Sequence, residues 1–78
     1  MTDKYVPSEI MQYFEYQHLR PDLQVASRPF CDLAVLIDKS TPPSAEKSTA
    51  LRKLLESKDC YVRAYMSANA KKAQVSNG

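Results

Sequence analysis

A chain of 78 residues, 44% of them hydrophobic and 26% charged, has room for one small domain and not for two hydrophobic cores. Its net charge of +2 is divided unevenly: residues 1–45 carry four Lys and Arg against six Asp and Glu, and residues 46–78 carry seven against three. This mild balance does not favour binding to duplex nucleic acid, which usually needs a continuous basic stripe, but it leaves enough cations for a small phosphorylated ligand.

Targeting and redox signals favour a cytosolic protein. No apolar run reaches the roughly 20 residues that cross a bilayer, and charged residues at positions 3, 4, 9 and 15 interrupt the stretch where a signal peptide is apolar. Cys31 and Cys60 have no Cys or His companion at metal-ligand spacing, so we interpret both as reduced core thiols and expect no metal. The chain is therefore expected to be neither secreted nor membrane-spanning.

The first predicted element is a short helical turn that Ser8 can cap and that runs through about Tyr13. Beyond it, Phe14, Tyr16 and His18 alternate with polar residues, and this period of two favours an extended aromatic arm. A lone arm is unstable in water, so it is expected to lie on helices or on another copy of the chain. Either arrangement delivers aromatic rings to a surface.

A first long helix is predicted from Pro21 to about Lys39. Pro favours the first turn of a helix, and the apolar positions that follow are spaced by three and four. These positions are Leu23, Ala26, Phe30, Leu33, Ala34 and Ile37. Pro29 lies inside the segment and has no backbone N–H, so we expect a kink there or separation of the first turns.

A second long helix is predicted from about Ser44 to Ala68, after a turn that contains Pro42 and Pro43, and either Thr41 or Ser44 can cap it. The connection is short, so the two helices should fold back as a hairpin. Two apolar stripes run along the second helix, and one shorter neighbour is not expected to cover both, so the remainder should pack on the arm or on a second copy. The stripes consist of Leu51, Leu55, Val62 and Met66, and of Leu54, Tyr61, Tyr65 and Ala68.

These elements predict an all-α fold: a two-helix antiparallel hairpin with a short N-terminal helical turn and an aromatic arm, assembled as a homo-oligomer. Residues 1–7 are expected to form a flexible leader, residues 8–68 the helical-hairpin domain, and residues 69–78 a disordered tail, because the apolar periodicity is lost there. A chain this short buries only about 60% of the surface it exposes when unfolded, which also points toward self-association.

Constellations typical of enzymes are nearly absent. His18 is the only histidine, no Ser or Cys has a recognisable base, and a single Gly excludes a glycine-rich phosphate loop. We therefore expect no catalysis and no cofactor.

Arg28 lies next to the expected kink, in the run Ser27-Arg28-Pro29-Phe30. It is either a solvated side chain that happens to precede a helix breaker, or a planar, always-charged donor that the kink holds against a phosphate or a base edge. The second interpretation makes Arg28 a ligand-binding candidate.

Two lysines of the second helix are further candidates. Lys58 falls within an apolar stripe, three residues after Leu55 and four before Val62, where a lone ammonium is costly to bury. Its stem either crosses the stripe so that the charge reaches water, or its charge binds an anion at a subunit junction. Lys53 is expected to pair with Glu56 unless it faces the arm of a partner.

The aromatic residues Tyr13, Phe14 and Tyr16 admit two interpretations. They can fill the core or an interface, or they can serve, together with nearby cations, as stacking platforms for nucleobases. His18 can hydrogen-bond to the start of the first long helix.

Four segments follow one another in a specific order: Phe14-Glu15-Tyr16-Gln17-His18-Leu19, Ser27-Arg28-Pro29-Phe30-Cys31-Asp32-Leu33-Ala34, Ala50-Leu51-Arg52-Lys53-Leu54-Leu55-Glu56 and Lys58-Asp59-Cys60-Tyr61-Val62-Arg63-Ala64. With the Pro turn between the second and the third, this order resembles the phage helical-hairpin family of anti-CBASS sponges. Those proteins bind cyclic oligonucleotides of bacterial immune systems without cleaving them, and some phage sponges act likewise on the cyclic ADP-ribose isomers of Thoeris defence.

The resemblance covers about residues 14–64 and implies a compact homohexamer with more than one class of pocket at its subunit junctions. It also implies that Arg28 and an aromatic residue just upstream, Tyr13 or Tyr16, contact the ligand. We therefore expect a protein of the infected host cytoplasm that sequesters cyclic dinucleotides, cyclic trinucleotides or cyclic ADP-ribose isomers, as a hexamer or otherwise a dimer. The alternative is a small helical module that binds a host protein through its Tyr61–Tyr65 face.

The expected site combines cations and rings. Arg28, with Lys53 or Lys58 from the same or a neighbouring subunit, holds phosphate. The rings expected to stack on bases are Tyr13, Phe14, Tyr16 or Phe30, with His18 nearby.

Overall fold

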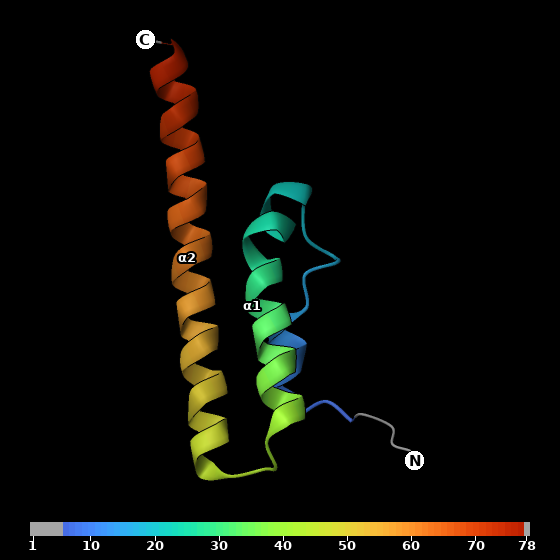
Figure 1. Cartoon of the computed structure of the whole chain (residues 1–78). Helices are drawn as coiled ribbons and strands as arrows, with labels where there is room; N and C mark the ends of the chain where they lie inside the picture. Colours follow the sequence, from blue (N-terminus) through green and yellow to red (C-terminus); the bar gives the residue numbers. More distant parts are fainter. Residues whose placement is uncertain (1–5, 78) are drawn as a thin grey trace.

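The computed structural model describes the backbone of residues 6–77 and the side chains of residues 6–69. This part of the chain contains three helices and no strand: the 3-10 helix η1 (Glu9–Phe14), α1 (Pro21–Ser40) and α2 (Ala45–Asn77). Helices α1 and α2 pack side by side as an antiparallel hairpin, with η1 against α1 (Figure 1). The predicted all-helical class and the hairpin are confirmed. No described helix is long and apolar enough to cross a membrane.

The helix ends follow local sequence signals. Pro21 begins α1, and the carboxylate of Asp22 accepts a hydrogen bond from the Leu23 backbone N–H at 2.9 Å. At the other end, the Thr41 hydroxyl donates to the carbonyl of Ile37 at 2.9 Å. The Ser44 hydroxyl oxygen accepts a hydrogen bond from the Lys47 N–H at 3.1 Å, so the cap predicted for the second helix is present.

Two predicted features of the long helices differ from the structure. Helix α1 is continuous through Pro29, so the expected separation of its first turns is wrong, while a kink at Pro29 stays a prediction. The missing N–H of Pro29 instead leaves the carbonyl of Val25, four residues earlier, without its usual helical donor. The end expected for the second helix near Ala68 is wrong, because α2 continues to Asn77 and projects beyond the first turn of α1 (Figure 1). The division into leader, domain and tail stays a prediction.

The core lies where η1 meets the hairpin. Met11, Phe14, Ala34 and Leu51 are buried there, and Phe14 is fully enclosed. The expectation that Phe14 belongs to an extended arm exposed at a surface is therefore not met: it is the last residue of η1. Partly buried side chains from both long helices surround this cluster, among them Ile10, Phe30, Cys31, Val35, Ile37, Leu54 and Leu55. A core this small depends on η1 staying in place.

Two polar contacts attach η1 to the hairpin. The Asp38 carboxylate of α1 accepts hydrogen bonds from the backbone N–H and the hydroxyl of Ser8, the residue before η1. At the other end of η1, the Lys58 ammonium of α2 donates to the carbonyl of Tyr13 at 2.7 Å. Both ends of the short helix are thus fixed by side chains from the long helices, which sets where the chain leaves η1 toward α1.

Candidate functional site

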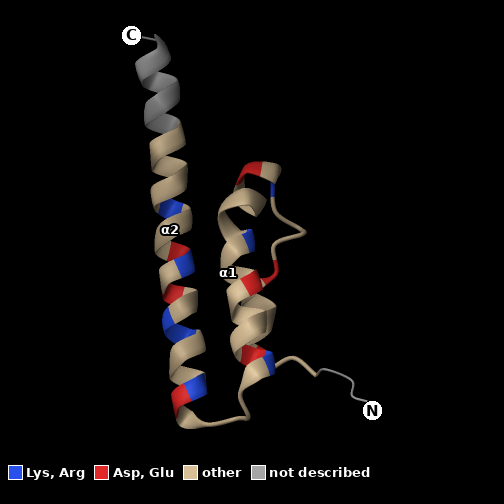
Figure 2. Cartoon of the chain, viewed as in Figure 1, with Lys and Arg blue, Asp and Glu red and all other residues tan. Residues whose placement is uncertain are grey.

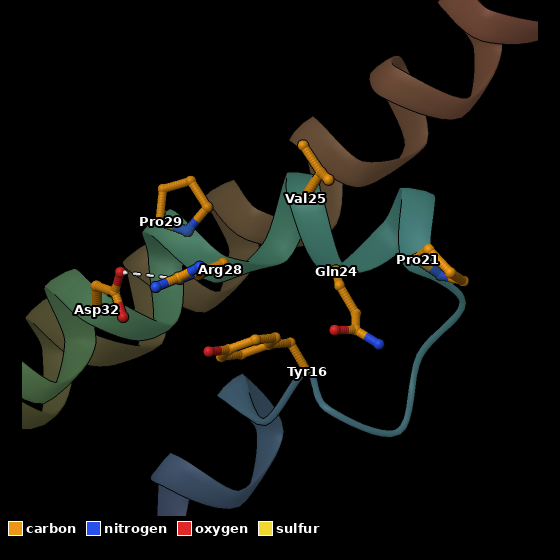
Figure 3. A pocket seen from close by; sticks show the side chains of 7 residues that line it. All are labelled: Tyr16, Pro21, Gln24, Val25, Arg28, Pro29 and Asp32. Carbon is orange, nitrogen blue, oxygen red and sulfur yellow. Dashed lines mark ion pairs between the residues drawn. The ribbon is translucent and has the colours of Figure 1, made fainter.

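A pocket of about 480 Å³ lies between the first half of α1 and the loop that joins η1 to α1 (Figure 3). Its volume falls in the range of small-molecule sites. Tyr16 and Arg28, both predicted to contact a ligand, line this same pocket. The complete lining consists of Tyr16, Pro21, Gln24, Val25, Arg28, Pro29 and Asp32.

The loop that carries Tyr16 is fixed by hydrogen bonds to its own backbone and to α1. The Leu19 N–H donates to the carbonyl of Tyr16 at 3.0 Å and closes a turn. The Gln24 side-chain amide then donates to the carbonyl of Leu19 at 2.7 Å and to that of Gln17 at 3.3 Å. These bonds hold the half-buried Tyr16 ring opposite the Arg28 turn of α1 (Figure 3).

Arg28 is available for a ligand. Its Nε lies 3.8 Å from an oxygen of Asp32, one turn further along α1, and both side chains are about two-thirds exposed, at 68% and 67%. An exposed pair of this kind contributes little to stability, so a better anion can compete for the guanidinium. The five N–H donors of a guanidinium leave several for other acceptors after this one contact.

Pro29 also changes the backbone hydrogen bonding of the helix beside the pocket. Pro29 and Val25 both line it, and the Val25 carbonyl is the one that Pro29 deprives of a helical donor. The pocket thus combines a tyrosine ring from the loop with a cation and a carboxylate that lie one turn apart on α1. Such a set suits a ligand that is aromatic, anionic and rich in hydrogen-bonding groups.

The other predicted aromatic residues lie elsewhere. Tyr13 is 58% exposed but belongs to η1 and does not line the pocket. Phe14 is enclosed in the core and cannot stack on a ligand without leaving it. Phe30 is half-buried and packs on Tyr61 of α2, with ring centroids 5.6 Å apart. His18 is exposed on the loop, outside the pocket lining. Of the predicted rings, the pocket therefore brings only Tyr16 next to Arg28.

The predicted lysines also lie outside the pocket. The Lys58 side chain is only 13% exposed, and its ammonium caps η1 through the Tyr13 carbonyl, 6.0 Å from the centroid of the Phe14 ring. This is neither of the two roles considered for Lys58, since the charge reaches a backbone carbonyl of the same chain. Lys53 is exposed on α2 and does not face the pocket of its own chain.

The sequence interpretation missed Gln24 and Asp32. Asp32 follows Arg28 by four residues, a spacing that puts both on one face of a helix and was visible in the sequence. Gln24 acts on carbonyls of the loop, and its role depends on the path of that loop. No local sequence pattern predicts this role of Gln24.

Thiol and metal chemistry find little support in the described part of the chain. Burial raises the pKa of the Cys31 thiol, and the negative charges of Asp32 and Glu15 add to this effect, so the nucleophilic thiolate is disfavoured. Both cysteines are free, but only Cys31 is partly buried. Cys60 is exposed, so the expectation that it is a core thiol is wrong. Among the residues described, no group of three His, Cys, Asp or Glu side chains is placed to hold a metal ion.

No protein-family model, curated protein or solved structure matches this chain.

Proposed function

We propose that this protein binds a cyclic oligonucleotide or a cyclic ADP-ribose-type messenger and sequesters it without cleavage, as a phage anti-defence protein that prevents activation of CBASS or Thoeris effectors. The observation that carries the proposal is the meeting of Tyr16 and Arg28 in one pocket of about 480 Å³. A base stacked on a tyrosine ring and a phosphate paired with a guanidinium are the two contacts that such a messenger needs.

The side chains that line the pocket favour binding of the messenger without cleavage. The titratable ones among them are Tyr16, Arg28 and Asp32, and the only histidine of the chain lies outside the pocket lining. Arg28 is always protonated, so only Asp32 and the Tyr16 phenol can exchange a proton, and the lining lacks the histidine that most often serves in general acid–base catalysis. The bound messenger is therefore expected to remain intact.

The size of the ligand favours an assembly of several copies, a hexamer or otherwise a dimer. One Tyr16–Arg28 pair serves one nucleotide unit, whereas a cyclic dinucleotide or trinucleotide has two or three. A second copy supplies the second pair, as a symmetric interface does. Exposed apolar side chains on both long helices offer surface for such contacts, namely Val25, Leu33, Leu36, Tyr61 and Met66.

The test has two measurements. Titration calorimetry against cyclic dinucleotides, cyclic trinucleotides and cyclic ADP-ribose isomers should show submicromolar binding of at least one, about −8 kcal/mol or better. Denaturation followed by chromatography should recover that ligand unchanged. A linear product contradicts sequestration, and binding of none of these ligands contradicts the proposal. Light scattering that gives a stable 8.8 kDa particle contradicts the assembly.

A second candidate function rests on a different surface. Phe30, Tyr61 and Tyr65 form a run of ring contacts with centroid distances of 5.6 and 6.0 Å, and Tyr61 is 45% exposed. In Figure 2 the part of α2 between its last blue turn and the grey end is tan, and residues 64–69 contain no charged residue. Exposed aromatic residues beside an uncharged helix segment are typical of a face that binds another protein. A Tyr61→Ser variant that loses a host partner and retains nucleotide binding would separate the two functions.

A further inference from the structure

The pocket contains two hydrogen-bond acceptors beside the Tyr16–Arg28 pair that the proposed function does not use. One is the Asp32 carboxylate, whose Oδ2 faces Arg28 Nε at 3.8 Å and whose other oxygen has no such neighbour in the lining (Figure 3). The other is the Gln24 side-chain oxygen. Because the Gln24 nitrogen donates to the carbonyls of Leu19 and Gln17, its amide orientation is fixed and its oxygen remains an acceptor.

The neighbouring charges of Arg28 and Asp32 form a pattern that a base edge can match. The guanidinium is a donor only, and an ionised carboxylate is an acceptor only. A flat group that lies against both must therefore present an acceptor to Arg28 and donors to Asp32. Because the two charged groups are 3.8 Å apart, the acceptor and the donors of the ligand must be adjacent.

Among the common nucleobases, only guanine has an acceptor followed by two adjacent donors on its Watson–Crick edge: O6, then N1–H and N2–H. Adenine and cytosine place a single amino donor next to a ring-nitrogen acceptor, so they can give Asp32 one hydrogen bond where guanine gives two. Uracil has one N–H between two carbonyl oxygens, so its second oxygen would meet the negative charge. Arginine bonding to guanine O6 and a carboxylate accepting from base N–H groups are both established forms of base recognition.

We propose that Asp32 is a specificity-determining residue that makes this pocket select guanine-bearing cyclic nucleotides. The guanine stacks on Tyr16, its N1–H and N2–H groups donate to Asp32, and its O6 accepts from Arg28. The remaining guanidinium N–H groups are left for a phosphate of the same ligand. This inference rests on the proposed function and narrows it to one class of messenger.

The test compares cyclic dinucleotides that share the same sugar–phosphate ring and differ in their bases. Calorimetry of the full chain with cyclic di-GMP, cyclic di-AMP and cyclic di-UMP should give at least a roughly ten-fold preference for cyclic di-GMP, as expected for one bidentate base contact. In Asp32→Asn one acceptor becomes a donor, so cyclic di-GMP loses one of its two hydrogen bonds to this residue and should bind roughly ten-fold more weakly or worse. Cyclic di-AMP keeps an acceptor for its single amino donor and should lose less affinity. The matched control is Glu56→Gln, which removes the same charge from an exposed position of α2 outside the pocket.

The outcomes separate the inference from the function on which it rests. Equal affinity of the wild-type chain for all three probes, or binding of cyclic ADP-ribose isomers alone, overturns guanine selection and leaves sequestration standing. An equal change for cyclic di-GMP and cyclic di-AMP in Asp32→Asn shows that Asp32 acts only through net charge, and it also overturns the inference. Binding of no cyclic nucleotide overturns both proposals. Because Asp32 is two-thirds exposed, the variant is expected to fold, which circular dichroism checks.

Discussion

The ammonium of Lys47 lies 2.9 Å from Oδ1 of Asp38, and the two side chains are only 8% and 1% exposed. Lys47 also donates to the backbone carbonyls of Asp38 and Thr41, at 2.9 and 2.8 Å, so its three N–H groups have three acceptors. The Asp38 carboxylate accepts in turn from Ser8. One buried ion pair thus joins the end of α1, the turn, the start of α2 and the segment that leads into η1.

The first prediction concerns this ion pair. Lys47→Ala leaves Asp38 charged and buried without its main partner, so the free energy of unfolding should fall by about 3–5 kcal/mol. Urea denaturation followed by circular dichroism measures the loss. Arg28→Ala is the comparison, because it breaks a pair that is about two-thirds exposed and should cost less than about 1 kcal/mol. Similar losses in the two variants would contradict the structural importance of the buried pair.

The second prediction concerns Lys58, which caps η1 through the carbonyl of Tyr13. Lys58→Ala removes the hydrogen bond to the Tyr13 carbonyl and should cost about 0.5–1.5 kcal/mol of stability. It should also speed amide hydrogen exchange in residues 9–14, because one end of η1 is released. Lys58 does not line the pocket, so ligand affinity should fall only if the release of η1 also moves Tyr16, which lies two residues after it. Lys53→Ala, at an exposed position of α2, is the control and should change neither stability nor exchange.

The hairpin was predictable because its signals are local. Pro21, the Pro42–Pro43 turn and the Ser44 cap lie within a few residues of the helix ends that they define. Of the apolar positions predicted for the first helix, Phe30, Ala34 and Ile37 belong to the core or pack against it, whereas Leu33 is exposed. The role of Phe14 was not predictable in the same way. Its alternation with Tyr16 has a period of two, but Phe14 closes a 3-10 helix and enters a core built by residues far away in the sequence.

The candidate site was predicted in part for the same reason. Arg28 and Tyr16 were identified from residue type and from the neighbouring Pro29, and the fold brings them together. Lys58 was assigned to a ligand because its charge fell within an apolar stripe. Its acceptor is a carbonyl 45 residues earlier in the chain, and the spacing of neighbouring residues does not predict such a contact.

The third prediction tests the two residues that carry the proposed function. Arg28→Ala should weaken binding of the messenger roughly ten-fold or more, because a charge-assisted bond to phosphate is lost. Tyr16→Ala should cost about 1–3 kcal/mol of binding free energy through the lost stacking. Calorimetry measures both, and light scattering should show an unchanged particle size.

The control for these variants is the double replacement of Lys71 and Lys72 by Ala, at positions whose side chains lie outside the described part of the chain. Its affinity should be nearly unchanged at physiological salt, since salt screens charges that do not contact the ligand. Loss of binding in the double replacement together with full binding in Arg28→Ala would mean that diffuse charge, and not the pocket, attracts the ligand.

The fourth prediction concerns pH and the Cys31 thiol, whose pKa is raised above the ordinary value of 9.0 by burial and then by the charges of Asp32 and Glu15. In the folded chain Cys31 holds its proton to higher pH than in the unfolded chain. Above about pH 9 the folded state therefore binds more protons, and its stability must fall as the pH rises further. Urea denaturation between pH 8 and pH 10 should show this decline, and a Cys31→Ala variant should show less of it.

The raised pKa also predicts the order of thiol modification. Iodoacetamide at neutral pH should modify the exposed Cys60 before Cys31, and mass spectrometry of the digested protein can measure this order. Faster modification of Cys31 would contradict the raised pKa, because only the thiolate reacts.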